Sequence, residues 1–206
     1  RELTALAIQR AAANDPRTAA AELEKLQVRM HDSERQWAWS QLGLQAAKRH
    51  YSEALDWYAL GGETPLSDEG AQWKVRAALR AHDWSVVLAT ISEMPPALAA
   101  QPEWVYWLGR AYKAGGLTSE ADVLFEKIAG QANFYGNLAD EELGRVVEVP
   151  PRAAAPTAEE LAIAAANPGF QRALALIRVD LRIEGVREWV WSLRGMDDRA
   201  LLAAAW

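Results

Sequence analysis

A repeat with a period near 33 residues most constrains the fold of this 206-residue chain. Turns between helical segments place Tyr51, Trp84 and Leu117 in register, 33 residues apart each time. Apolar residues keep the same register on both sides of the turns: Leu42, Val75 and Leu108 before them, and Tyr58, Ile91 and Leu124 after them. Two helices per repeat at this period predict a tetratricopeptide-like α-superhelix, in which stacked helical hairpins share one core.

The segments before and after the repeats also show helical spacing of apolar residues. Helices are predicted over 2–13, 16–30 and 32–48, and capping residues such as Asp15 and Ser67 precede predicted helix starts. After Gly144 a proline-rich linker over 150–156 leads into four shorter helices. These are expected over 157–166, 170–183 and 186–194, with a turn at Glu184-Gly185, and from Asp197 to the chain end.

The predicted fold class is therefore all-α, with two domains. An α-superhelical repeat domain is expected over 1–144, and a small helical linker domain over 145–206. A helix that begins at Asp197 is still running at Trp206, so we expect the linker domain to be truncated at its C-terminus. Most of the ten tryptophans recur at helical spacing beside Leu and Ala, which indicates that they fill gaps between helices rather than line a sugar groove.

Composition excludes several classes of function. A net charge of −6 and a pI near 5.2 give no attraction to phosphate backbones or anionic lipid, so no nucleic-acid partner is expected. No apolar run reaches the roughly 20 residues that a membrane-spanning helix needs, so no membrane span is expected. The absence of cysteine excludes disulfides, thiolate metal sites and cysteine nucleophiles.

Three segments together resemble the soluble lytic murein transglycosylases. The first is 104–116 (WVYWLGRAYKAGG) with 120–129, the second is the Asn-Phe-Tyr-Gly stretch over 133–144, and the third runs from 172 to 205. In that family the large α-superhelical domain ends with the first two segments, and a smaller helical linker domain carries the third. The specific part of the resemblance covers about 90 of the 206 residues.

The resemblance implies a periplasmic parent enzyme that cleaves the MurNAc–GlcNAc bond of peptidoglycan. Family members form a 1,6-anhydro product and use one carboxylic acid as general acid and then base. That acid is a Glu followed by Ser, with Gly-Leu-Met-Gln soon after, in a lysozyme-like domain beyond the linker domain. This chain contains neither motif. No catalytic residue, cofactor or metal site is therefore predicted, and the chain is expected to be inactive alone.

The strongest candidate for ligand contact is a basic stripe on the first helices of consecutive repeats. Arg76 and Arg80 share one helix face at i, i+4, and Arg110 and Lys113 do so at i, i+3. Stacked repeats could join the two pairs into a surface that meets peptidoglycan carboxylates. The alternative is that these cations only complement helix C-termini. The adjacent acid pairs, including Glu159-Glu160, are interpreted as solvated faces or helix N-terminal charges, and His50 and His82 as residues near helix ends.

Three functions follow from these patterns. The first is the non-catalytic superhelical and linker portion of a lytic transglycosylase, which would position peptidoglycan glycan strands or the catalytic domain. The second is a free-standing tetratricopeptide-like adaptor that binds a protein partner on its concave face. The third, an enzyme in its own right, has no supporting constellation of residues.

Overall fold

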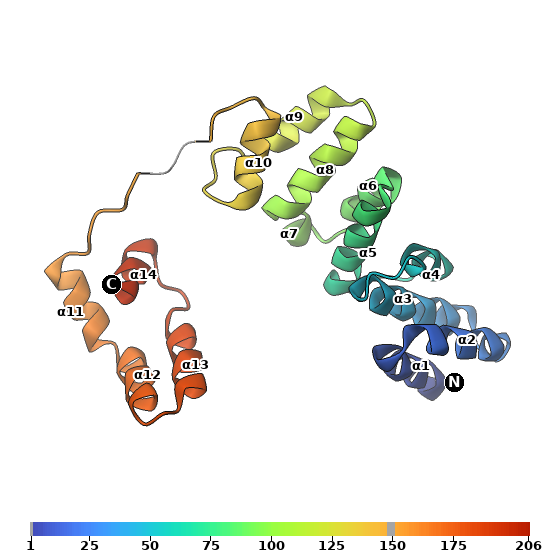
Figure 1. Cartoon of the computed structure of the whole chain (residues 1–206), viewed down its shortest axis with the longest axis horizontal. Helices are drawn as coiled ribbons and strands as arrows, with labels where there is room; N and C mark the ends of the chain where they lie inside the picture. Colours follow the sequence, from blue (N-terminus) through green and yellow to red (C-terminus); the bar gives the residue numbers. More distant parts are fainter. Residues whose placement is uncertain (1, 148–150) are drawn as a thin grey trace. The chain divides into compact units, whose positions relative to one another are not determined.

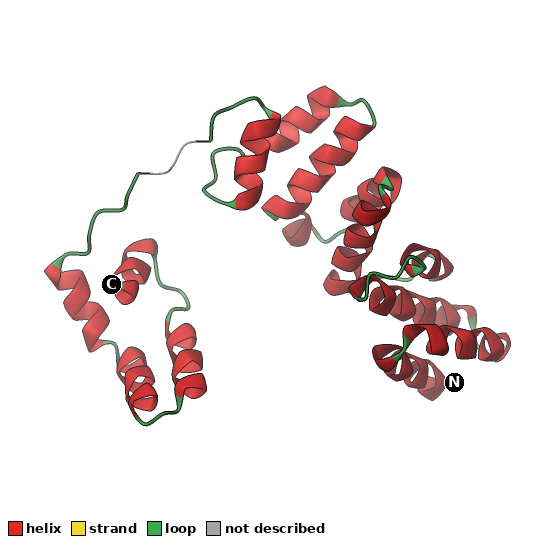
Figure 2. Ribbon diagram, viewed as in Figure 1, coloured by secondary structure: helices red, strands yellow, loops and turns green. Residues whose placement is uncertain are grey.

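The computed structural model describes residues 2–147 and 151–206, and these form helices joined by loops, without a strand (Figures 1 and 2). The predicted all-α fold is confirmed. The chain divides into two compact units, Arg1–Val149 and Pro150–Trp206, which are described in turn. The boundary predicted from sequence falls at 144/145. Of the predicted linker, residue 150 lies outside the described residues, and 151–156 form a loop.

The first unit is a series of helical hairpins. Its helices pair as α1 with α2, α3 with α4, α5 with α6 and α8 with α9, and neighbouring hairpins contact through α1 and α3, α3 and α5, and α6 and α8. The bounds are α1 Glu2–Asn14, α2 Pro16–Leu26, α3 Asp32–Lys48, α4 Ala54–Leu60, α5 Asp68–Ala81, α6 Trp84–Ser92, α7 Pro96–Ala99, α8 Pro102–Ala114, α9 Thr118–Glu126 and α10 Phe134–Glu142, with a 3-10 turn at Gln27–Arg29.

The first helices of three hairpins end in the same way. A residue with positive φ follows each of α3, α5 and α8, and the next N–H donates to the carbonyl five residues back, which satisfies the helix end. The donating residues are Tyr51, Asp83 and Leu117. Asp83, and not Trp84, is therefore the equivalent of Tyr51 and Leu117, so the predicted register is wrong by one residue in the middle repeat. Histidine holds the positive-φ position twice, His50 at 60° and His82 at 55°, so both lie at helix ends as predicted.

Two glycines allow the helices of a hairpin to approach closely. A Cβ added at Gly109 would lie 2.6 Å from Cε1 of Phe125, and one at Gly43 would lie 2.8 Å from Cγ of Tyr58. Phe125 is completely buried, whereas Leu124 is only partly buried. In the α8–α9 hairpin the residue that packs against the glycine is thus Phe125, and not Leu124, which the sequence register aligns with Tyr58. One more residue lies between Gly109 and Phe125 than between Gly43 and Tyr58 in the α3–α4 hairpin.

Tryptophans contribute to the cores of the first unit, as predicted. Trp39 and Trp104 are buried, and the other five pack against the buried clusters: Trp37, Trp57, Trp73, Trp84 and Trp107. In the second unit Trp189 packs on Phe170 with ring centroids 4.5 Å apart, while Trp191 and Trp206 are exposed. Indole rings therefore fill the spaces between stacked helices of the first unit.

The second unit contains a hairpin of α12 and α13, with α14 packed on α11. The bounds are α11 Ala158–Ala166, α12 Pro168–Arg178, α13 Arg182–Ser192 and α14 Asp198–Ala205. The predicted turn at Glu184-Gly185 is wrong. The chain turns at Asp180, which has φ 66°, and Gly185 lies inside α13. Gly185 is needed there because a Cβ would lie 2.6 Å from Ile177 and 2.8 Å from the Ala173 carbonyl oxygen.

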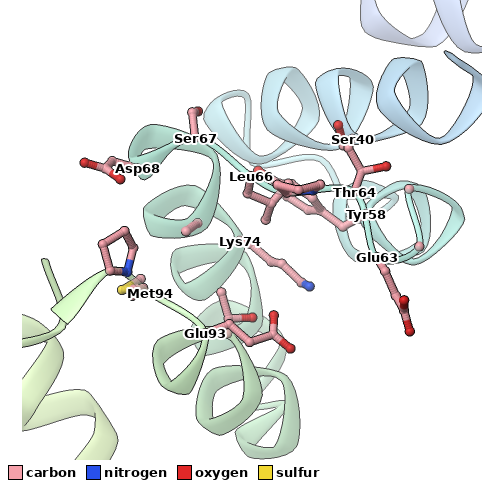
Figure 3. Close-up of a pocket in the computed structure, with 16 residues that line it drawn as sticks. Ser40, Tyr58, Glu63, Thr64, Leu66, Ser67, Asp68, Lys74, Glu93 and Met94 are labelled. Atoms are coloured by element: carbon pink, nitrogen blue, oxygen red, sulfur yellow. The ribbon is translucent and has the colours of Figure 1, made fainter. Parts of the chain in front are cut away.

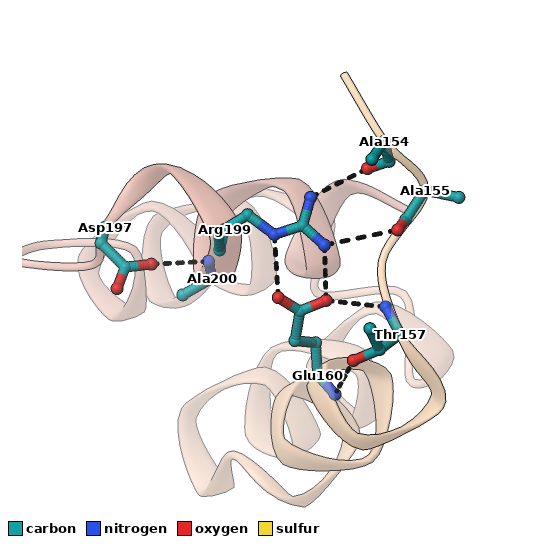
Figure 4. A network of polar contacts seen from close by, with 7 residues as sticks. All are labelled: Ala154, Ala155, Thr157, Glu160, Asp197, Arg199 and Ala200. Carbon is teal, nitrogen blue, oxygen red and sulfur yellow. Dashed lines mark hydrogen bonds and ion pairs between the residues drawn. The ribbon is translucent and has the colours of Figure 1, made fainter.

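An arginine on α14 connects this helix to α11 and to the loop before α11 (Figure 4). Arg199 on α14 donates to both carboxylate oxygens of Glu160, at 2.8 and 2.6 Å, and to the carbonyls of Ala154 and Ala155, at 2.9 and 3.3 Å. Glu160 also completes a capping box with Thr157 at the start of α11. The hydrogen bond from Arg199, with help from the Thr157 N–H, lowers the pKa of Glu160 to about 2. Glu160 is thus a helix N-terminal charge, which is one of the two roles expected from the sequence, and it is also the ion-pair partner of Arg199.

Candidate functional site

The first pair of the predicted basic stripe lies on α5 and is engaged within the chain. The Arg76 guanidinium lies over the rings of Trp73 and Trp104, at 5.2 and 5.1 Å, and 3.7 Å from the Glu103 carboxylate. Arg80 donates to the carbonyl of Ala47 at the end of α3, at 3.0 Å. Partial burial lowers the pKa of Arg80. Each cation therefore links its helix to a neighbouring hairpin.

The second pair lies on α8 and converges on one carboxylate. Glu142, at the end of α10, receives a hydrogen bond from Lys113 at 2.8 Å and lies 3.0 Å from Arg110. The Tyr106 hydroxyl lies between them, accepting from Arg110 at 3.0 Å and contacting Glu142 at 3.4 Å. Burial acts to raise the pKa of Glu142, but the Lys113 hydrogen bond and the two positive charges outweigh it, so the pKa is lowered. This cluster fastens α10 to α8.

The structure thus places all four cations at defined positions but does not connect the two pairs. Among the described residues, the partners of Arg76 and Arg80 differ from those of Arg110 and Lys113, which share Glu142. All four side chains remain partly exposed, so contact with a ligand stays a prediction. Sequence reasoning missed Arg49, which donates to the carbonyls of Ala13 and Asn14 at the end of α1, much as Arg80 does at the end of α3.

A polar cavity of about 480 Å³ lies against the face of α5 that carries Ala71 and Lys74. The loop between α4 and α5, one face of α5 and the end of α6 form its walls (Figure 3). Lys74 on α5 and Glu93 at the end of α6 line it, together with Glu63 of the loop and the buried Thr90. Tyr58 closes one side, and its buried hydroxyl donates to the Gly70 carbonyl at 3.0 Å. Sequence reasoning missed this cavity because its walls come from elements that are separate in the sequence, including Ser40 of α3 and Tyr58 of α4.

Neither a metal centre nor a bilayer-spanning helix is found in the part of the chain that the structure describes. Over 2–147 and 151–206, no three or more His, Cys, Asp or Glu side chains are grouped so that they could hold an ion. Among the same residues no helix combines the length and apolar character needed to cross a bilayer.

Comparison with known proteins identifies relatives at the level of structure. No protein-family model matches the chain, and no curated protein matches it significantly. An inactive mutant of lytic transglycosylase Slt from Pseudomonas aeruginosa is similar with a TM-score of 0.69 and 27% identity, over 97% of this chain and 33% of that one. The 70 kDa soluble lytic transglycosylase SLT70 from Escherichia coli is similar with a TM-score of 0.61 and 17% identity, over 97% and 32%.

This chain spans about a third of the length of either solved structure. The similarity to the Escherichia coli protein shows a shared fold, and that to the Pseudomonas aeruginosa protein adds a sequence identity of 27% over nearly the whole chain. The resemblance inferred from the three sequence segments is therefore confirmed, and the chain matches the helical part of lytic transglycosylases of the Slt70 type.

Proposed function

We propose that this chain is the non-catalytic helical portion of a periplasmic lytic transglycosylase. Its parent cleaves the MurNAc–GlcNAc bond of peptidoglycan to give 1,6-anhydro products. The helical portion, an α-superhelical domain over 1–144 followed by a linker domain, positions glycan strands or the catalytic domain. The observation that carries this proposal is the 27% identical match to a lytic transglycosylase over 97% of the chain.

The parent gene and its product test the catalytic part of the proposal. We expect the reading frame beyond Trp206 to encode a Glu-Ser pair followed by Gly-Leu-Met-Gln, within one further domain of about 100–200 residues. The full-length product should release 1,6-anhydromuropeptides from purified murein, and the 206-residue chain alone should release none. An unrelated downstream sequence, or anhydro products from the isolated chain, would contradict the proposal.

Sedimentation with purified murein tests the positioning role. The 206-residue chain is expected to co-sediment with murein, and Arg76→Gln should reduce the bound fraction because it removes a partly exposed cation of the predicted stripe. Arg10→Gln is the matched control, because Arg10 is an exposed cation of α1 outside the stripe. Equal retention of the two variants would exclude Arg76 from murein binding, and a chain that stays in the supernatant would refute the positioning of glycan strands.

A further inference from the structure

The cavity between the α4–α5 loop, α5 and α6 contains a buried hydroxyl that the protein does not satisfy. Thr90 is 3% exposed, lines the cavity, and its Oγ1 has no hydrogen-bond partner. One other buried side-chain polar atom of the described residues is unpaired, Nε1 of Trp104, and Trp104 belongs to a hydrophobic core and does not line the cavity. An unpaired buried hydroxyl costs free energy, and a bound molecule that supplied a partner would recover it.

Charges of both signs line the same cavity without neutralising one another. Lys74 is half-buried, and Figure 3 shows it and Glu93 extending toward the same space. Neither of them, nor Glu63, takes part in any ion pair or side-chain hydrogen bond among residues 2–147 and 151–206. The arginines of the basic stripe differ, because each has a partner within the chain.

The arrangement of charge selects the chemistry of a ligand. The Lys74 ammonium group and the carboxylates of Glu63, Asp68 and Glu93 line the cavity. Together they complement a molecule that carries both a carboxylate and an ammonium group. The one aromatic ring in the lining belongs to Tyr58, which is buried with its hydroxyl already bonded, so the cavity offers no exposed ring on which a sugar could stack. The volume of about 480 Å³ lies within the range of small-molecule sites.

We propose that this cavity binds a short peptide with a free ammonium group and a free carboxylate. Lys74 binds the carboxylate, Glu93 and Glu63 bind the ammonium group, and the Thr90 hydroxyl bonds to the peptide between them. The proposal does not depend on the proposed function, because it rests on the cavity alone and its test uses soluble peptides without glycan. Failure of peptide binding and failure of murein sedimentation are therefore separate outcomes.

The test is a chemical-shift titration of the 206-residue chain with tetra-alanine in four forms: free, N-acetylated, C-amidated and blocked at both ends. The free peptide should shift the amides of the cavity. Each blocked end should raise Kd about 10-fold or more, because a charge-assisted hydrogen bond contributes about 1.5–3 kcal/mol and 1.4 kcal/mol is tenfold in affinity. Equal binding of the free and doubly blocked peptides, or shifts that map outside the cavity, would overturn the proposal.

Two variants separate the roles of the cavity residues. Lys74→Met should weaken the free peptide about 10-fold or more and remove its advantage over the C-amidated form. Lys127→Met is the control, because Lys127 is an exposed lysine outside the cavity. Thr90→Val keeps the buried volume and removes the unpaired hydroxyl, so it should weaken binding without lowering the unfolding midpoint. Equal Kd values for Lys74→Met and Lys127→Met would overturn the site, and unchanged binding by Thr90→Val would overturn the role of its hydroxyl.

Discussion

Replacing Gly109 with alanine tests the close contact that defines the last hairpin of the first unit. The added methyl carbon would lie 2.6 Å from Cε1 and 3.0 Å from Cζ of Phe125. Carbon atoms in ordinary contact are about 3.5–4.0 Å apart, so α8 and α9 must separate or the ring must leave its position. Because Phe125 is completely buried, neither movement is free of cost.

Two opposing effects set the size of the change. Overpacking a filled core costs about 1–3 kcal/mol. Replacing glycine with alanine within a helix raises the free energy of unfolding by about 1 kcal/mol, because alanine has the higher helix propensity. The net expectation is that Gly109→Ala lowers the free energy of unfolding by up to about 2 kcal/mol, the difference between these two terms.

Urea unfolding followed by circular dichroism at 222 nm measures this change, with two further variants for comparison. Gly115→Ala is the matched control, because a methyl group there would meet its nearest neighbours at 3.4 and 3.6 Å and its φ is −81°. Phe125→Leu shortens the opposing side chain, so Gly109→Ala should cost less in that background, a coupling of about 0.5 kcal/mol or more. A Gly109→Ala chain at least as stable as the Gly115→Ala control, or equal costs in both backgrounds, would refute the steric reasoning.

Three other substitutions follow from the same structure. Trp104→Ala should lower the free energy of unfolding by about 3–5 kcal/mol, because the Trp104 side chain is 1% exposed. Trp191→Ala should change it little, because Trp191 is 63% exposed, and similar losses for the two variants in urea unfolding would contradict this prediction. Glu142→Gln should cost about 1–3 kcal/mol at pH 7. Because the folded-state pKa of Glu142 is lowered from 4.5, the stabilisation that its carboxylate provides is present above pH 4.5 and lost as pH falls through the folded pKa. A stability difference between the native chain and Glu142→Gln that stays constant in acid would contradict this role of the carboxylate. Arg199→Gln should speed limited proteolysis of the loop before α11, because it removes the hydrogen bonds to the carbonyls of Ala154 and Ala155. Cleavage no faster than in the control Arg178→Gln, which replaces an exposed arginine, would show that these hydrogen bonds do not protect the loop.

Features governed by a few neighbouring residues could be predicted from the sequence. Asp15, Ser67 and Asp197 cap α2, α5 and α14 as expected, because each accepts hydrogen bonds from backbone N–H groups two or three residues further on. The capping box of Thr157 and Glu160 is local in the same way. Such bonds depend on residue type and spacing, both of which are visible in the sequence.

Features that depend on tertiary packing could not be predicted from the sequence. Glycine suggests a turn, but Gly185 lies within a helix where another helix approaches, while Asp180 takes the positive φ of the turn. His50 and His82 likewise replace glycine at helix ends. The partners of the basic residues are also distant in sequence: Lys113 and Glu142 are 29 residues apart. Helical periodicity identifies a buried face, but not the residue that faces it from the next helix.

The carboxylates that already pair with the basic stripe determine which of its cations a ligand carboxylate can reach, because the ligand must displace the carboxylate of the protein. Glu142 is 17% exposed and holds both Arg110 and Lys113, so withdrawing either cation would leave a half-buried carboxylate with less compensation. Arg76 meets Glu103 at 3.7 Å, and both side chains are about a third exposed. Exposed pairs of this kind contribute only about 0–1 kcal/mol, so a ligand carboxylate can displace Glu103 at little cost. Among the three stripe cations that are paired with a carboxylate, Arg76 should therefore be the first to bind an anion.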